Sequence, residues 1–167
     1  MSNSDILDHH RKLIEQAVLR AYVSVREPRY FFKDERIHAP EIDGFVSALS
    51  ENYDIEETTD LNVDCSRVFA LTCAGNEWIL WRSLVGPFVA IVRLESPDRR
   101  VLVRSSDSPQ APPGLATLLE SQGCILLEAC ELAAPIPLAG VSALNGEVST
   151  FAALFSDCEY LPWERPR

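Results

Sequence analysis

Four apolar segments between residues 67 and 104 constrain the fold more than any other feature of the chain. Each segment is rich in valine, isoleucine, phenylalanine or tryptophan and is bounded by glycine, proline, asparagine or aspartate, which is the pattern of β-strands between turns. The connections are only a few residues long, and so short a connection joins antiparallel neighbours. The sequence therefore predicts an antiparallel β-meander with strands at residues 67–74, 77–85, 88–95 and 99–104.

Helical spacing of apolar residues predicts an N-terminal helix that runs up to Glu27. It ends there because the residue before a proline avoids the helical region. A second helix is predicted from Pro40 to Asn52, with proline in its first turn. Helices around a contiguous antiparallel meander define an α+β fold, and the length fits a single domain over residues 1–167. The other expected elements are a helix at 115–122, a strand at 124–132, an extended segment at 133–137 and a helix at 151–155.

The composition excludes several classes of protein. The chain carries 15 basic and 25 acidic side chains, a formal net charge of −10, and 47% hydrophobic residues. These proportions are those of a packed domain and not of a disordered chain or a generally basic nucleic-acid binder. No stretch reaches the ~20 apolar residues that span a bilayer, and the first residues lack the basic and apolar regions of an export signal. We expect a cytoplasmic protein with no membrane and no nucleic-acid partner.

The five cysteines and three histidines do not form a recognisable site. The number of cysteines is odd, and no pair has the C-x-x-C spacing of zinc or redox sites. His9 and His10 are neighbours on a predicted helix, so they point about 100° apart and do not chelate one metal together. We expect reduced structural thiols and no metal. A cysteine nucleophile paired with a distant histidine is the alternative interpretation.

Acidic residues are concentrated in two segments that contain no base. Residues 39–66 hold eight acids, and residues 105–164 hold another eight. A segment without internal counter-charge projects a negative field, which steers a cationic partner toward it. We interpret the densest stretch as the docking surface for a basic protein, with an exposed tyrosine as its desolvated anchor. The predicted partner-binding residues are Glu51, Tyr53, Asp54, Glu56, Glu57, Asp60 and Asp64.

This hypothesis requires that the acids around Glu57 lie open to water and are not neutralised by arginines of the same chain. The alternative is a solvated acidic face that only keeps the protein soluble. Calcium binding is a further alternative, although the segment lacks the D-x-D-x-D-G pattern of an EF-hand loop.

Six arginines lie in the meander segment, and their role stays open. Arg82, Arg93, Arg100 and Arg104 fall on predicted strands, where Arg100 and Arg104 share a face. A basic sheet face binds an anion in some proteins, but it also pairs with acids of the same chain or is simply solvated. No aromatic-interleaved pattern typical of single-strand nucleic-acid binding accompanies these arginines.

Motifs that identify an enzyme are absent from the sequence. It contains no glycine-rich phosphate loop, no H-E-x-x-H and no G-x-S-x-G. We therefore predict that the protein is not an enzyme. Trp78 and Trp81 lie three positions apart on one predicted strand and so face opposite sides. We expect one of them in the core and the other at the surface, where a tryptophan is a typical interface residue.

An acidic α+β domain with no catalytic motif and an uncompensated acidic segment resembles the immunity proteins of bacterial polymorphic toxin systems. Those proteins bind a cognate toxin domain, which is often a basic nuclease or deaminase, and block its active site. The resemblance covers the general character of the chain, and no signature motif transfers site residues. It implies a cognate basic toxin as partner, no cofactor and no catalysis.

Two other classes of function remain as alternatives. One is a small-molecule-binding or enzymatic α+β domain with a pocket between the sheet and its helices. The other is a structural or chaperone-like adaptor with an exposed apolar patch. The sequence leaves the partner's identity, the oligomeric state and the strand order open.

Overall fold

The predicted meander is the centre of the fold. The computed structural model describes residues 3–139, 146–158 and 160–164. Five antiparallel strands follow one another across the sheet in chain order, which confirms the meander and the α+β class. A short sixth strand runs parallel to the fourth. The strands are β1 (Asp54–Glu57), β2 (Ser66–Cys73), β3 (Asn76–Ser83), β4 (Phe88–Ser96), β5 (Arg99–Leu102) and β6 (Ile125–Leu126).

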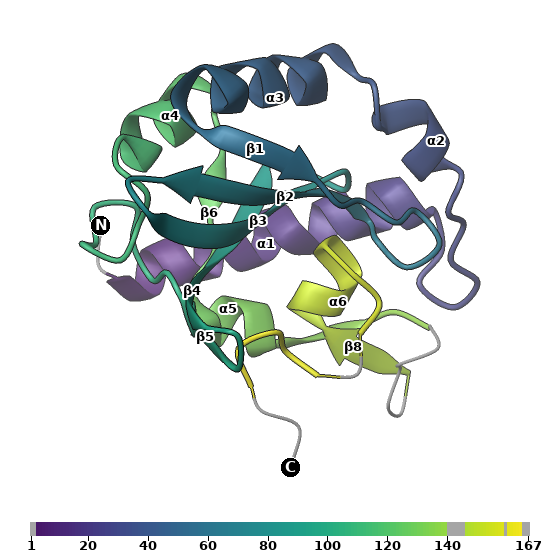
Figure 1. Cartoon of the computed structure of the whole chain (residues 1–167). Helices are drawn as coiled ribbons and strands as arrows, with labels where there is room; N and C mark the ends of the chain where they lie inside the picture. Colours follow the sequence, from purple (N-terminus) through teal and green to yellow (C-terminus); the bar gives the residue numbers. More distant parts are fainter. Residues whose placement is uncertain (1–2, 140–145, 159, 165–167) are drawn as a thin grey trace.

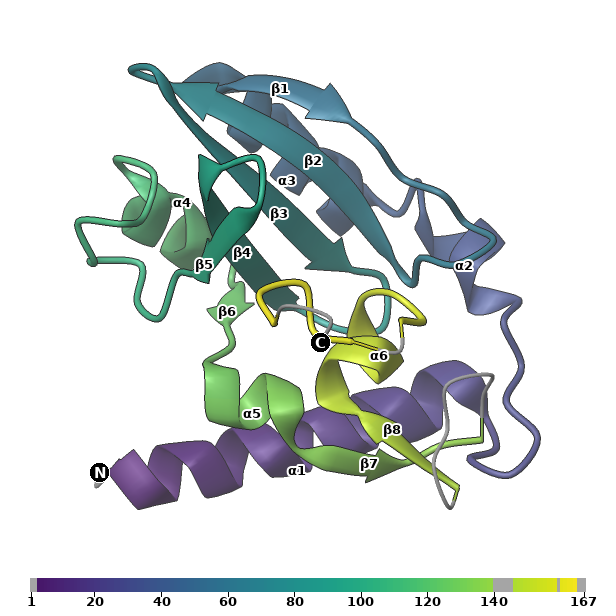
Figure 2. The ribbon, with the colours of Figure 1, turned by 60° about the horizontal axis from the view of Figure 1, so that its bottom comes forward.

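Helices lie on both sides of this sheet (Figure 1). Two of them, α3 (Pro40–Asn52) and α4 (Leu115–Ser121), cover one face. The remaining elements, apart from the short connecting helix α2, lie toward the other face and the end of the sheet where β3 turns into β4 (Figure 2). They are α1 (Asn3–Tyr22), α5 (Ala129–Ala133), α6 (Thr150–Leu154), and a small antiparallel pair of β7 (Pro135–Pro137) and β8 (Glu147–Ser149), whereas α2 (Phe32–Arg36) connects α1 to α3.

Successive side chains of the strands enter two different hydrophobic cores. On one face, Phe69 and Leu80 pack in a cluster with Phe45 of α3. On the other face, Val68 packs in a cluster with Phe151 of α6. This alternation is the two-residue period of a β-strand, and it makes the same strands the wall of both cores.

The two tryptophans of β3 follow the same alternation. Trp78 belongs to the core under α3, and Trp81 belongs to the core under α6. The prediction that they face opposite sides is confirmed. The expectation that one of them is exposed is wrong, because helices cover both faces of the sheet at these two positions and both side chains are buried.

Polar contacts hold α6 against only one end of the sheet. The Ser66 hydroxyl donates to the Phe155 carbonyl at 2.8 Å, and the Ser83 hydroxyl donates to the Leu154 carbonyl at 2.6 Å. Ser66 and Ser83 are cross-strand partners at the end of β2 and β3 that lies away from their connecting turn. The other end of this face, beside the β2–β3 turn, is left without a covering helix (Figure 2).

Several predicted boundaries agree with the structure. The helices at Pro40–Asn52 and Leu115–Ser121 lie where they are expected, and the proline-bearing segment 133–137 contributes the extended strand β7. The N-terminal helix ends at Tyr22, before its predicted end. Val23 follows it with φ of 64°, a left-handed backbone that stops the helix.

The strand predicted at 124–132 is wrong for most of its length. Only Ile125 and Leu126 pair with β4, and they pair in parallel. The rest turns into α5, because Glu128 and Glu131 form a capping box in which each side chain accepts from the other's backbone N–H. An assignment by periodicity misses this E-x-x-E pattern because the residues around it are mostly apolar.

No helix in the described part of the chain is both long and apolar enough to cross a bilayer.

Candidate functional site

The uncovered end of the sheet face is acidic. Asp54 and Glu56 of β1 and Glu77 of β3 project from this face, and all three are exposed. Thr72 and Ala70 of β2 lie between the acids of β1 and Glu77, and the partly exposed Leu94 of β4 lies on the other side of Glu77. A hollow of about 280 Å³ opens among these residues. We call this surface, defined by Asp54, Glu56, Ala70, Glu77 and Leu94, the open sheet face.

The carboxylates of the open sheet face have no cationic partner. None of the ion pairs among the described residues involves Asp54, Glu56 or Glu77. The base nearest along the register is Arg100 of β5, which lies two strands away from Glu77. At about 4.8 Å per strand, the two backbones lie about 10 Å apart, and no ion pair joins Arg100 to Glu77. The negative charge of this face is therefore uncompensated.

Glu57 does not belong to this surface. Its carboxylate accepts two hydrogen bonds from the Arg67 guanidinium, at 2.9 and 2.6 Å, and Arg67 also pairs with Asp43 at 3.1 Å. The hydrogen bonds from Arg67 are the largest cause that holds the pKa of Glu57 below its ordinary value. Glu57 lies opposite Phe69, on the face covered by α3, where Arg67 also projects. The expectation that the acids around Glu57 are free of arginine is wrong for Glu57 itself.

Two other predicted site residues are buried. Tyr53 is 6% exposed and donates its hydroxyl to the Pro113 carbonyl at 2.7 Å, so it is not the exposed anchor that we expected. Asp64 is 7% exposed and accepts the Asp60 backbone N–H at 2.8 Å. Burial is the largest cause that raises the pKa of Asp64. Both residues stabilise local structure and are not available to a partner.

The remaining predicted residues flank β1. Glu51 is exposed in the last turn of α3. Asp60 is exposed in the turn after β1, where its Oδ1 accepts hydrogen bonds from the backbone and side chain of Asn62 at 3.0 and 2.8 Å. Glu51, Asp54, Glu56 and Asp60 thus form an exposed acidic row along and beside β1. Glu77 joins it from two strands away, although it falls outside the predicted segment.

Replacing Asp64 with asparagine is expected to increase the free energy of unfolding at pH 7 by about 0.5–1 kcal/mol. Asparagine keeps an oxygen acceptor for the Asp60 N–H and removes a buried charge. When the pKa of a carboxyl is higher in the folded protein than in the unfolded chain, the protein loses stability as the pH rises from the lower of these two values through the higher one. The advantage of D64N, measured by urea denaturation, is therefore expected to shrink as the pH is lowered toward 4. A variant less stable than the native protein at pH 7 would contradict this assignment.

An apolar groove lies beyond the end of β1, and the sequence does not predict it. Phe31 is 72% exposed, and Tyr30 and Val63 are exposed beside it. These residues line a groove of about 690 Å³ between the segment before α2 and the loop after β1. Lys33 ties the two walls together, because its ammonium donates to the Leu61 carbonyl at 2.9 Å and lies 5.1 Å from the centre of the Tyr30 ring. The Tyr30-Phe31-Phe32 run is the signal that points to it.

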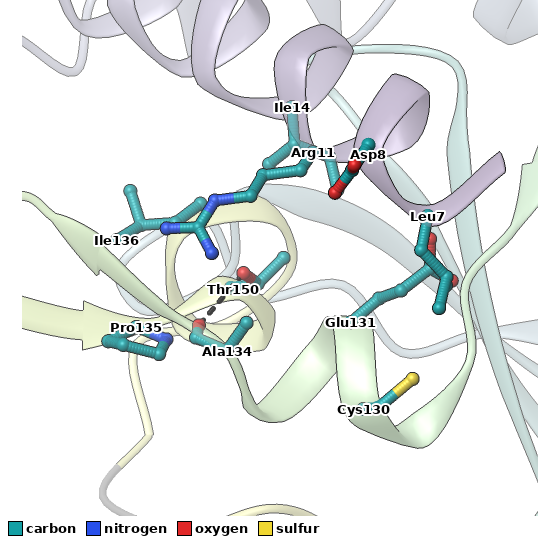
Figure 3. Close-up of a pocket in the computed structure, with 10 residues that line it drawn as sticks. All are labelled: Leu7, Asp8, Arg11, Ile14, Cys130, Glu131, Ala134, Pro135, Ile136 and Thr150. Carbon is teal, nitrogen blue, oxygen red and sulfur yellow. Dashed lines mark hydrogen bonds between the residues drawn. The ribbon is translucent and has the colours of Figure 1, made fainter. Parts of the chain in front are cut away.

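A smaller cavity lies between α1 and the α5–β7 segment (Figure 3). Its volume is about 200 Å³, and the polar side chains that line it include Asp8, Arg11, Glu131 and Thr150. Glu131 Oε1 lies 2.8 Å from His10 Nδ1, at hydrogen-bond distance, and Thr150 donates its hydroxyl to the Ala134 carbonyl. Glu131 therefore joins α5 to α1, whereas Arg11 pairs with Glu15 of its own helix at 3.0 Å.

The arginines of the meander do not gather into a basic face. Arg82 is buried and donates to two backbone carbonyls, and Arg93 donates to Asn76 at 2.6 Å. Arg100 and Arg104 are exposed. Arg93 lies opposite Val101, so it projects from the face opposite to that of Arg100. Arg82 and Arg93 therefore do not converge with Arg100 on one surface.

No protein-family model, curated protein or solved structure matches this chain. Within residues 3–139, 146–158 and 160–164, no group of three or more histidine, cysteine, aspartate or glutamate side chains is placed to hold a metal ion. The function is therefore inferred from the surface alone.

Proposed function

We propose that this chain binds and inhibits a basic protein, in the manner of the immunity proteins of bacterial polymorphic toxin systems. The open sheet face supports the proposal most strongly. It combines three exposed, unpaired carboxylates, from Asp54, Glu56 and Glu77, with a hollow that is also lined by the apolar side chains of Ala70 and Leu94. Such a surface suits lysine and arginine side chains, whose aliphatic stems cover apolar surface while their charged ends reach the acids.

The apolar groove provides the apolar contacts that the acidic side chains cannot make. Isolated ion pairs at a surface contribute only ~0–1 kcal/mol each, so charge mainly accelerates encounter. Affinity comes from a few desolvated apolar contacts near the centre of an interface. Phe31, Tyr30 and Val63 offer such contacts, and the loop that carries Asp60 connects their groove to β1. In this proposal they take the anchoring role that the sequence suggests for Tyr53.

The proposal includes a cytoplasmic location. All five cysteines are free, and free thiols persist in a reducing compartment. The alternative of a small-molecule or enzymatic pocket has less support. That alternative expects a pocket between the sheet and its helices, but the hollows of about 200 and 690 Å³ described above lie between α1 and the α5–β7 segment and between two loops, respectively.

Reversing the charge of Asp54 and Glu56 is expected to slow association with the partner about tenfold or more at low salt, because these carboxylates provide the attractive field. The probe is the product of the reading frame next to that of this protein in its source genome. We expect this product to be basic, to inhibit growth when expressed alone, and to be harmless when co-expressed with this chain. Association rates of D54K/E56K and the native protein are then compared by surface plasmon resonance at several salt concentrations.

The matched control is D107K/E120K, which makes the same change in net charge at exposed acids outside the open sheet face. Loss of the salt dependence in D54K/E56K and its retention in the control support the proposal. A neighbouring gene product that neither inhibits growth nor forms a complex with this chain contradicts it. Equal effects of the two double variants also contradict it, because they would show that only the total charge matters.

A further inference from the structure

The outer edge of β1 leaves backbone hydrogen-bonding groups unpaired. β1 is the first strand in the sheet order, and in the described part of the chain it pairs only with β2. Just after β1, the Thr58 N–H donates to the Val68 carbonyl at 2.8 Å, in the register of the same ladder. Backbone groups of an antiparallel strand alternate in direction, so Asp54 and Glu56 face β2 as Thr58 does. The N–H and C=O groups of Ile55 and Glu57 therefore point away from the sheet.

The side chains of β1 specify what an added strand must carry. Asp54 and Glu56 project from the open sheet face without cationic partners, whereas Glu57 is already neutralised by Arg67 on the other face. Ile55 packs at the margin of the core under α3. Residues directly opposite one another on neighbouring strands have Cβ atoms ~4.5–5.5 Å apart. A neighbouring strand would thus meet an acid, an apolar residue and a second acid in succession.

We propose that the basic partner adds an extended segment to the edge of β1 as a further strand of the sheet. In this segment, lysine or arginine residues lie opposite Asp54 and Glu56, and an apolar residue lies opposite Ile55. The inference rests on the proposed function, since it specifies which part of the basic partner the same surface takes. Main-chain hydrogen bonds to Ile55 and Glu57 provide affinity, and the alternating side chains provide specificity.

The same charges select against other occupants of the edge. Exposed strand edges associate with one another unless charge or shape prevents it. Two copies of this chain paired edge to edge would bring the unpaired acids of β1 together, and like charges on adjacent strands are destabilising. The exposed acids of β1 therefore exclude self-association while they favour a basic strand, which makes charge complementarity the selective feature of this edge.

Hydrogen exchange of the backbone amides tests the inference directly. The probe is a short synthetic peptide of alternating lysine and valine, and the control peptide has the same composition with its lysines grouped at one end. We expect the Ile55 and Glu57 amides to exchange rapidly in the free protein and at least about tenfold more slowly with the alternating peptide. The Asp54 and Glu56 amides, which already bond to β2, are the internal reference and are expected to change little.

Proline at position 55 provides an independent test. Ile55→Pro removes the outward N–H and leaves the ladder with β2 intact, because that N–H does not bond to β2. We expect Ile55→Pro to weaken binding of the alternating peptide about tenfold relative to Ile55→Ala, which shortens the same side chain and keeps the N–H. Titration by fluorescence anisotropy measures this ratio, and the exchange experiment on the native protein does not depend on either variant folding.

Each outcome distinguishes the inference from the proposed function. Slower exchange at Ile55 and Glu57 with the alternating peptide, absent with the control peptide, supports strand addition. Unchanged exchange with both peptides, or equal binding by the proline and alanine variants, overturns strand addition, and a complex with the neighbouring gene product would then leave the proposed function standing. Protection by the peptide without any such complex overturns the proposed function and keeps the edge as a site for basic strands.

Discussion

Replacing Phe151 with alanine is expected to lower the free energy of unfolding by about 3–5 kcal/mol, the usual cost of truncating a fully buried phenylalanine. Phe151 has no exposed surface, and its ring meets three other aromatic rings. The ring centres of Trp81, Phe155 and Trp163 lie 5.4, 5.3 and 5.6 Å from its own. Truncation leaves a cavity at the contact between α6 and the sheet, and few neighbours are free to fill it.

Phe31→Ala is the matched control, because it makes the same truncation at a side chain that is 72% exposed. We expect its effect to stay within about 0.5 kcal/mol. Thermal unfolding followed by circular dichroism measures both variants, and we expect F151A to lower the melting temperature by about 10 °C or more. Because the same strands contribute side chains to both cores, we expect the two cores to unfold together in a single transition. Two separated transitions would contradict the prediction of a single domain over residues 1–167.

Replacing Arg82 with alanine is expected to lower the free energy of unfolding by about 2–4 kcal/mol. Arg82 is 3% exposed, and its Nη1 donates to the carbonyls of Ser83 and Gly86 at 2.6 Å each. Its guanidinium also lies 5.5 Å from the centre of the Phe45 ring. The substitution removes the donor to both carbonyls of the β3–β4 turn. The substitution also removes a buried positive charge, and this gain offsets part of the loss. Burial is the main cause that lowers the pKa of Arg82.

Two further variants separate the causes of the Arg82 effect. Arg82→Met keeps most of the aliphatic stem, so its free energy of unfolding should fall less than that of R82A. The remaining decrease should reflect mainly the lost hydrogen bonds to the turn. Arg100→Ala removes an exposed arginine and is expected to change the stability by no more than about 0.5 kcal/mol. Urea denaturation of all three variants gives the comparison. If R82A is as harmless as R100A, the turn does not depend on this buried guanidinium.

Local signals predicted the elements that pack as expected. The meander strands and the helix at Pro40–Asn52 follow from alternating apolar residues, turn residues and a proline at the helix start, all of which act between near neighbours in the chain. β1 escaped prediction because its segment, Asp54–Glu57, contains three acids and one apolar residue. It forms a strand because the preceding helix and its pairing with β2 hold it at the edge of the sheet.

The sequence predicted only part of the candidate site, because local signals do not report contacts between segments far apart in the chain. Counting charges located the acidic segment, and Asp54 and Glu56 within it are exposed as expected. Counting could not foresee that Arg67 pairs with Glu57, since this contact depends on the register of β1 against β2. It also could not place Glu77 beside the open sheet face. That position depends on which strands are neighbours and which end of the sheet α6 leaves bare.

The sequence by itself determined the α+β class, the antiparallel meander and the density of negative charge, because these follow from residue types and from spacing along the chain. Only the tertiary structure decided which acids remain exposed without a cationic partner. Glu57 is neutralised by an arginine and Asp64 is buried, while Asp54 and Glu56 remain exposed and unpaired. The physical reason is that neutralisation and exposure are set by strand register and helix docking, which bring together groups far apart in the chain.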